Sequence, residues 1–203
     1  MPAAPPLPVA PTPDPGVRLA PPRWDEATRP RGPAPEPGRR YPAAGLASGE
    51  QLVAIHDHLR AELEQLRGLV AQVLAGALDP AAARGRINVM TMRQNAWTIG
   101  AYCASYCRLV ATHHTIEDQA LFPRLRAGDP RLDAVVDRLH AEHEVIHDVL
   151  EGVDRALLDL VGPGADGSAL RRAVDELTDS LLSHLSYEEH ELVEPLARLS
   201  IPL

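Results

Sequence analysis

Residues 113–123 read HHTIEDQALFP, and this stretch decides how the rest of the chain is interpreted. His113 and Glu117 are four residues apart, so in a helix they lie one turn apart on the same face. His114 and Asp118 have the same spacing, rotated around the helix by about 100°. An imidazole and a carboxylate on one inward face can both reach a metal ion inside a helical bundle. The stretch therefore predicts a helix that contributes metal ligands.

A helical period runs through this stretch from about residue 87 to residue 126. Its inward stripe consists of Ile99, Tyr102, Tyr106, Leu109, His113, Glu117 and Leu121. Because His113 and Glu117 belong to that stripe, we prefer them as ligands, and the pair His114 and Asp118 remains the alternative. Consecutive helical residues point about 100° apart, so we expect only one of the two histidines to face the bundle interior.

Three more segments show the same helical period. The first spans about residues 50–78, the second about 130–160, and the third runs from a glycine-rich loop at 162–167 to Pro195. Short loops between long helices favour antiparallel neighbours. The sequence therefore predicts an all-α protein, an up-down-up-down four-helix bundle.

Each of these three helices also carries histidine on its apolar stripe. His56 lies on the first, His143 and His147 are one turn apart on the second, and His184 lies on the third. A lone histidine on an apolar face is more often a hydrogen-bonded core residue than a metal ligand. Several imidazoles and carboxylates that face one interior would carry a severe desolvation penalty unless a cation coordinated them. The set as a whole predicts a metal centre.

The number of candidate ligands predicts two metal ions. The candidates are His56, His113, Glu117, His143, His147, His184 and Glu188, with Glu189 as the alternative to Glu188. Five imidazoles and two carboxylates exceed the needs of one tetrahedral zinc, and no thiolate joins them. If two six-coordinate ions share two bridging carboxylates and one bridging oxygen, about one position stays open. A small ligand such as dioxygen, nitric oxide or peroxide would bind there.

The order of one His, then HxxxE, HxxxH and HxxxE resembles the hemerythrin (HHE cation-binding) family over about residues 50–197. The segments HHTIEDQALFP and AEHEVIHDVL are similar to the family's HxxxE-x-x-x-LFP and EHxxxH segments. They carry over His113, Glu117, His143 and His147, and His56 and His184 match the family's first and last histidines. The resemblance implies two non-haem, oxygen-bridged iron ions in a four-helix bundle. It also implies one of several roles: oxygen binding, nitric oxide response, peroxide handling, iron sensing or iron-centre repair.

The first 48 residues contain 14 of the 20 prolines and lack any periodic apolar face. Such a composition neither sustains a helix nor buries much apolar surface. We therefore divide the chain into a disordered Pro/Ala-rich tail at 1–48 and a bundle at 49–203. The tail is expected to be dispensable for folding and iron loading, with a protein partner as the alternative role.

Composition narrows the function classes. A formal net charge of −8 disfavours nucleic acid, which requires a basic surface. No run of about 18 apolar residues predicts a membrane span, and Cys103 and Cys107 are interpreted as reduced thiols of a cytoplasmic protein. The leading hypothesis is a protein that binds or senses dioxygen or nitric oxide at a di-iron centre. The competing hypotheses are an enzyme that consumes peroxide or nitric oxide there, an iron-handling or repair protein, and a structural adaptor that uses the tail.

Overall fold

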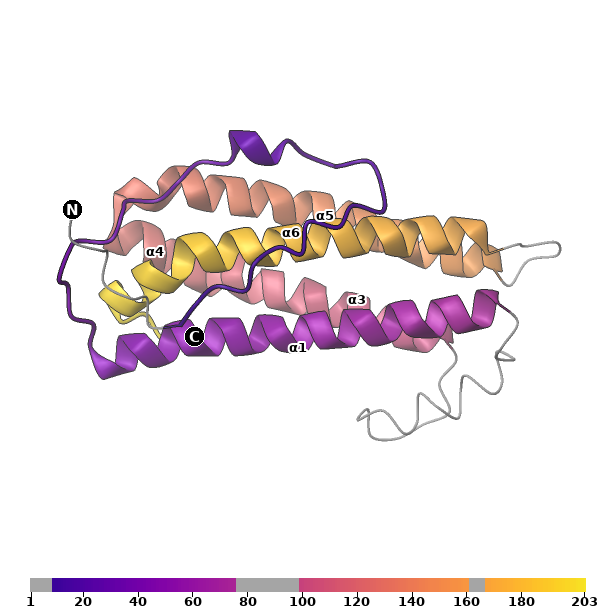
Figure 1. Ribbon diagram of the computed structural model, residues 1–203, viewed down its shortest axis with the longest axis horizontal. Coiled ribbons are helices and arrows are strands. Elements are labelled where there is room, and N and C mark those ends of the chain that lie inside the picture. The colour runs from indigo at the N-terminus through magenta and orange to yellow at the C-terminus, as the bar shows by residue number, and fades with distance from the viewer. Residues whose placement is uncertain (1–8, 76–98, 161–166) are drawn as a thin grey trace.

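The computed structural model describes residues 9–75, 99–160 and 167–203, and within these ranges the chain forms helices and no strand. Four long helices lie side by side (Figure 1): α1 (Ala43–Leu74), α3 (Ile99–Ile116), α5 (Asp133–Leu160) and α6 (Ser168–Leu199). This arrangement confirms the all-helical bundle. None of the helices in these ranges combines the length and the apolar character that a bilayer span requires.

Helix α1 packs against α6 in the opposite direction. Gly45, near the start of α1, lies so close to Ala197, near the end of α6, that a Cβ atom on Gly45 would stand 2.1 Å from the Ala197 carbonyl oxygen. Further along, His56 of α1 lies beside Glu188 of α6. The absence of a side chain at Gly45 permits this close approach of the two backbones.

Several helix ends differ from the sequence prediction. Helix α1 begins at Ala43 rather than near residue 50. The helix predicted to end near residue 126 continues from α3 through a π-helical turn, η2 (Glu117–Leu121), into α4 (Phe122–Gly128) and ends at Gly128. In that turn the amide of Phe122 donates to the carbonyl of Glu117, five residues earlier. Helix α6 likewise runs through Pro195 to Leu199. The part of the predicted helix at 87–98 lies outside the described residues.

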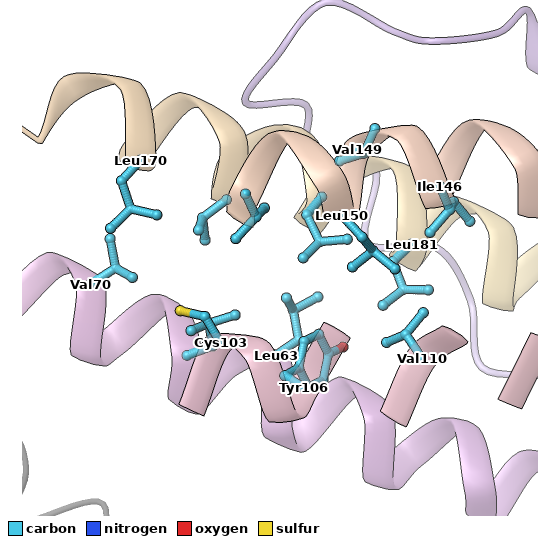
Figure 2. Close-up of a cluster of buried hydrophobic side chains, with 14 of the residues drawn as sticks. Leu63, Val70, Cys103, Tyr106, Val110, Ile146, Val149, Leu150, Leu170 and Leu181 are labelled. Carbon is cyan, nitrogen blue, oxygen red and sulfur yellow. The ribbon is translucent and has the colours of Figure 1, made fainter. Parts of the chain in front are cut away.

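The bundle interior contains two apolar clusters with a polar layer between them. One cluster fills one half of the bundle and includes Leu63, Tyr106, Ile146 and Leu181 (Figure 2). The other lies towards the start of α1 and the end of α6 and consists of Leu52, Val53, Leu121, Phe122, Leu125, Leu132, Val135, Val136, Leu139, Tyr187, Leu192, Val193, Leu196 and Ile201. On α1 and α5, buried histidine or glutamate separates the residues of one cluster from those of the other, and on α6 the buried His184 and Glu188 lie where one cluster gives way to the other.

Over residues 9–42 the N-terminal segment lies against the bundle in the structure, and the disordered tail predicted for 1–48 is not confirmed. It runs along α6, turns back past a 3-10 turn, η1 (Glu26–Thr28), and then leads into α1 (Figure 1). Its amides at Leu19 and Ala20 donate to Asp179. This placement has no periodic signal in the sequence, because isolated hydrogen bonds and ion pairs hold the segment in place.

Candidate metal centre

The polar layer brings seven imidazole and carboxylate side chains into one site, contributed by α1, α3, η2, α5 and α6. Among the described residues they form two groups, and within each group one ligand atom per residue lies within 4.8 Å of the others. The first group consists of His56, His113, Glu117 and Glu188, and the second of His114, His143 and His184. All but His113, which is half-buried, are buried.

In the first group, side-chain atoms of α1, α3, η2 and α6 converge. The Nε2 atoms of His56 and His113 are 3.2 Å apart, and His113 Nε2 lies 3.2 Å from Glu117 Oε1. Glu188 Oε2 lies 3.6 Å from His56 Nε2. The closest approach of each imidazole to its neighbours is thus through Nε2, the nitrogen remote from the backbone.

The second group contains three imidazole rings in mutual contact. The rings of His114 and His143 stack with centroids 3.9 Å apart, and the His184 ring meets both nearly edge-on, at 5.4 Å from His114 and 4.8 Å from His143. Phe122 stacks on the other side of His143, with centroids 5.3 Å apart. This packing limits how far the His143 ring can rotate.

Glu117 and Glu188 join the two groups. Glu117 Oε1 lies beside His113 of the first group, while Oε2 lies 3.6 Å from His143 Nε2 of the second. Glu188 Oε2 lies 3.6 Å from the Nε2 atoms of both His56 and His184. Both carboxylates therefore lie between the imidazoles of the two groups.

Carboxylates outside the site hold three of the imidazoles by Nδ1. His56 Nδ1 lies 3.0 Å from Glu189, His143 Nδ1 lies 2.9 Å from Asp118, and His184 Nδ1 lies 3.2 Å from Glu142. A carboxylate ion only accepts hydrogen bonds, so each contact places the proton on Nδ1 and leaves the lone pair on Nε2. This tautomer is the one that presents Nε2 to a metal ion.

Burial shifts the pKa values of the site towards its uncharged form. Desolvation lowers the pKa of His113 to about 2 and that of His143 to about 4, and it holds the pKa of His114 well below the usual range. Desolvation and the neighbouring carboxylates raise the pKa of Glu117, and desolvation raises that of Glu188 to about 7. A cation would reverse the penalty on both carboxylates while it used the neutral imidazoles as they stand.

The residues fit a metal ion by a separate criterion, because ligand-type atoms of the site are buried without a partner. Among the described residues, no hydrogen-bond partner exists for the Nε2 atoms of His114, His143 and His184, for Glu117 Oε2, or for either carboxylate oxygen of Glu188. Buried polar atoms are rarely left unpaired in native proteins. These atoms converge on the same two groups, so a cation there would satisfy them together.

Comparison with known protein families gives the same answer. Residues 48–196 match the family model described as the hemerythrin HHE cation binding domain. The chain belongs to the hemerythrin family. No curated protein and no solved structure matched the chain in the corresponding comparisons.

Six of the seven predicted ligands of this hemerythrin domain lie in the two groups, and His147 does not. The His147 side chain is 63% exposed and lies 3.9 Å from Glu151 on the outer face of α5. The buried face of α5 instead runs through His143 and Ile146. The structure therefore does not bring His147 into either group, because the position one turn after His143 has already rotated away from the interior.

His114 takes the place that was predicted for His147, so the site still holds five imidazoles. The expectation that only one of His113 and His114 faces the interior is wrong, since each contributes to a different group. The helix stripe had been drawn through Leu109, which is 39% exposed, whereas Val110 is fully buried. The centre of the inner face thus lies between His113 and His114, and a site wide enough for two groups accommodates both.

The other two alternatives are also placed. Glu188 lies between the two groups, and the equally buried Glu189 contacts His56 Nδ1 from outside them. Asp118 does not join a group of ligands among the described residues and holds His143 and His140 by their Nδ1 atoms. Sequence spacing named both carboxylates as alternative ligands and did not predict their position outside the groups, where each follows a group member by one residue.

A pocket of about 590 Å³ opens beside the first group. His113 and Glu117 form part of its wall, and most of the remaining wall is apolar, with Ile55, Leu109 and Ile116 among the lining residues. A small uncharged molecule needs no polar partners, so it could reach the first group along this apolar wall.

Cys103 and Cys107 are uncharged thiols, and the hydroxyls of Tyr106 and Tyr187 are engaged elsewhere. Burial raises the pKa of Cys103 to about 12 and that of Cys107 to about 11, so both remain thiols at neutral pH. The hydroxyl of Tyr106 donates to the Leu59 carbonyl, and that of Tyr187 donates to the Pro30 carbonyl.

Proposed function

We propose that this hemerythrin protein holds two non-haem iron ions in the polar layer and binds a small ligand, dioxygen or nitric oxide, at that centre. The observation that carries the proposal is the convergence of seven side chains whose buried Nε2 and carboxylate atoms largely lack other partners. Glu117 and Glu188 would bridge the ions, and the five imidazoles would complete the two sets of ligands. Bound iron would supply a redox-active centre with an open coordination position.

The nitrogen-rich ligand set favours reversible ligand binding over strong oxidation chemistry. Neutral imidazoles outnumber carboxylates by five to two across the two groups. Imidazole ligands leave the centre less negatively charged than a carboxylate-rich set would, so they stabilise its higher oxidation states less. The same nitrogen donors suit iron better than they suit magnesium or calcium, which prefer oxygen.

The surrounding residues orient the imidazoles and exclude water from the site. Glu142, Glu189 and Asp118 fix the tautomer of three imidazoles, so that Nε2 is available for a metal ion. The apolar clusters lie on both sides of the layer and limit its contact with water. The pocket beside His113 and Glu117 then provides an apolar approach that suits an uncharged diatomic molecule.

The first experiment is metal analysis of the purified protein together with its optical spectrum. We expect about two iron atoms per chain and a near-ultraviolet charge-transfer band of an oxygen-bridged ferric pair. Anaerobic reduction is then followed by titration with dioxygen, nitric oxide and peroxide. A stable stoichiometric adduct supports the proposal, whereas repeated turnover of peroxide or nitric oxide indicates an enzyme, and one zinc per chain without the band contradicts the proposal.

The pocket gives a sharper test of where the ligand enters. Leu109→Trp would fill space in the pocket wall, and we expect slower association of nitric oxide with unchanged iron content. Leu158 is 66% exposed on α5 and does not line this pocket, so Leu158→Trp is the matched control. Equal association rates in the two variants would show that the ligand takes another route.

A further inference from the structure

The N-terminal segment reaches the metal centre indirectly, through the carboxylates that hold its histidines. Its hydrogen bonds first run along α6 towards the start of that helix and then return towards its end. In chain order the bonded pairs are Thr12 with Glu189, Leu19 with Asp179, Glu26 with Ser183, Pro30 with Tyr187 and Gly32 with Glu191. Three of these contacts are backbone amides that donate to carboxylates of α6. A proline-rich segment forms few hydrogen bonds with itself, so acidic side chains of the bundle become the partners of its remaining amides.

Arg29 is the most firmly held residue of the segment. Its Nε and Nη2 atoms each lie 2.8 Å from one carboxylate oxygen of Glu142, and the side chains of Arg29 and Glu142 are only 9% and 2% exposed. The guanidinium also lies over the Tyr187 ring at 4.6 Å and near the Trp24 ring at 5.5 Å. A two-point contact of this kind fixes the orientation of the carboxylate as well as its charge.

Glu142, held by Arg29, in turn contacts His184 of the second group. Its Oε2 atom, which accepts from Arg29 Nη2, lies 3.2 Å from His184 Nδ1. Arg138 contacts the other oxygen, Oε1, at 2.7 Å. Arg29 is therefore the cation that holds the oxygen facing the histidine, while Arg138 holds the oxygen further from it.

A parallel contact reaches the first group. The amide of Thr12 donates to Glu189 Oε2 at 2.6 Å, and Glu189 Oε1 lies 3.0 Å from His56 Nδ1. Arg60 of α1 also contacts Glu189 Oε1, at 2.7 Å. The segment thus contacts the outer carboxylate of one histidine in each group, whereas His143 is held by Asp118 of the bundle itself.

We propose that the N-terminal segment is an intramolecular clamp that positions imidazoles of the metal centre, an inference that rests on the metal centre proposed above. Arg29 is the principal positioning residue and acts on His184 through Glu142. Thr12 acts on His56 through Glu189 in the same way. The clamp restricts both rings before metal arrives, so less orientational freedom is lost on binding. The segment is then required for tight metal binding, contrary to the expectation that it is dispensable.

The test compares Arg29→Ala with Arg31→Ala in the full chain. Arg31 belongs to the same segment and also faces an α6 carboxylate, Glu191, but its side chain is 75% exposed and its contact is longer, at 3.5 Å. Fe²⁺ affinity is measured anaerobically by competition with a chelator, and helix content and unfolding midpoint are measured on the metal-free proteins. We expect Arg29→Ala to weaken Fe²⁺ binding about 10- to 100-fold while it still folds, and Arg31→Ala to bind like the parent protein.

A second pair of variants separates positioning from general stabilisation. If Arg29 acts through Glu142, Glu142→Gln should weaken Fe²⁺ binding by a similar factor, and Arg29→Ala should add little in the Glu142→Gln background. Two independent, multiplying losses would contradict the clamp. Should Arg29→Ala not fold, Arg29→Lys keeps the charge but loses the two-point contact, and it should still weaken Fe²⁺ binding.

The outcomes distinguish this proposal from the proposed function. A parent protein that takes up no metal overturns both. A parent protein that loads iron, beside an Arg29→Ala variant that binds Fe²⁺ equally tightly, overturns only the clamp and leaves the metal centre in place.

Discussion

The polar layer and the apolar clusters on either side of it are equally buried, yet opposite forces hold them. Leu63 and Leu181 are removed from water, and each contributes about 1.5–3 kcal/mol through that burial. His184 and Glu188 are also fully buried, but their desolvation opposes folding. The comparison shows that the clusters stabilise the bundle, whereas the layer is tolerated for what it binds.

The largest expected effect concerns the layer itself. His114→Ala removes an imidazole of the second group, so we expect the iron content to fall to about half or less of the parent value. His147→Ala, which changes an exposed histidine on α5, should leave iron content unchanged. Metal analysis of both variants, with circular dichroism to confirm folding, checks the comparison.

The reverse result would reassign the site. If His147→Ala lost iron while His114→Ala retained it, the ligand predicted from sequence spacing would be correct, and the groups seen in the structure would not describe the loaded protein.

The next effect concerns the clusters and sharpens the contrast. Leu63→Ala creates a cavity in the cluster shown in Figure 2 and should lower the free energy of unfolding by about 2–5 kcal/mol. Iron content per folded chain should stay at the parent value, because Leu63 belongs to the apolar cluster and to neither group of candidate ligands. Denaturant unfolding with metal analysis of the folded fraction measures both quantities.

The control for this change is Leu158→Ala, which removes an exposed leucine and should alter stability by less than about 0.5 kcal/mol. A Leu63→Ala variant that lost iron in proportion to its stability would mean that the layer and the clusters are not separable.

The same contrast explains what could be predicted from the sequence. The helices and six candidate ligands followed from helical stripes, because an apolar interior imposes the 3.6-residue period on every helix that borders it. His56 and His184 were found because they interrupt apolar stripes with a side chain that a core does not favour. The fold and most of the candidate site could thus be predicted from regular periodicity in the sequence.

The errors arose where a one-residue rotation decides the answer. His113 and His114 were treated as exclusive because a single line was taken as the inner face, but two groups side by side widen that face beyond one residue. On α5, the buried Ile146 marks the inner face, and His147 lies outside that face in the structure. The placement of the N-terminal segment could not be predicted, because the contacts of Arg29 and Thr12 join residues far apart in the sequence and leave no periodic signal.

The smallest effect expected is a change in how stability depends on pH, and His113 provides it. Burial lowers the pKa of His113 from 6.5 to about 2 in the folded protein. Below pH 6.5 the unfolded chain takes up a proton at this position and the folded chain does not. Proton uptake by the unfolded state favours unfolding, so this histidine makes the metal-free protein less stable as the pH falls from 6.5.

His113→Gln removes that proton uptake, so the free energy of unfolding should fall less steeply below pH 6.5 than in the parent, by up to about 1.4 kcal/mol per pH unit. Denaturant titrations of both metal-free proteins between pH 7 and pH 5 measure the two slopes. Glu188 acts in the opposite sense, because its pKa is raised to about 7 and its stabilising contribution is lost as the pH rises through that value. Since Glu188 is present in both proteins, the difference between the slopes isolates His113. Parallel slopes would show that His113 takes up its proton in the folded protein as readily as in the unfolded chain, and that the layer is more open to water than the clusters beside it.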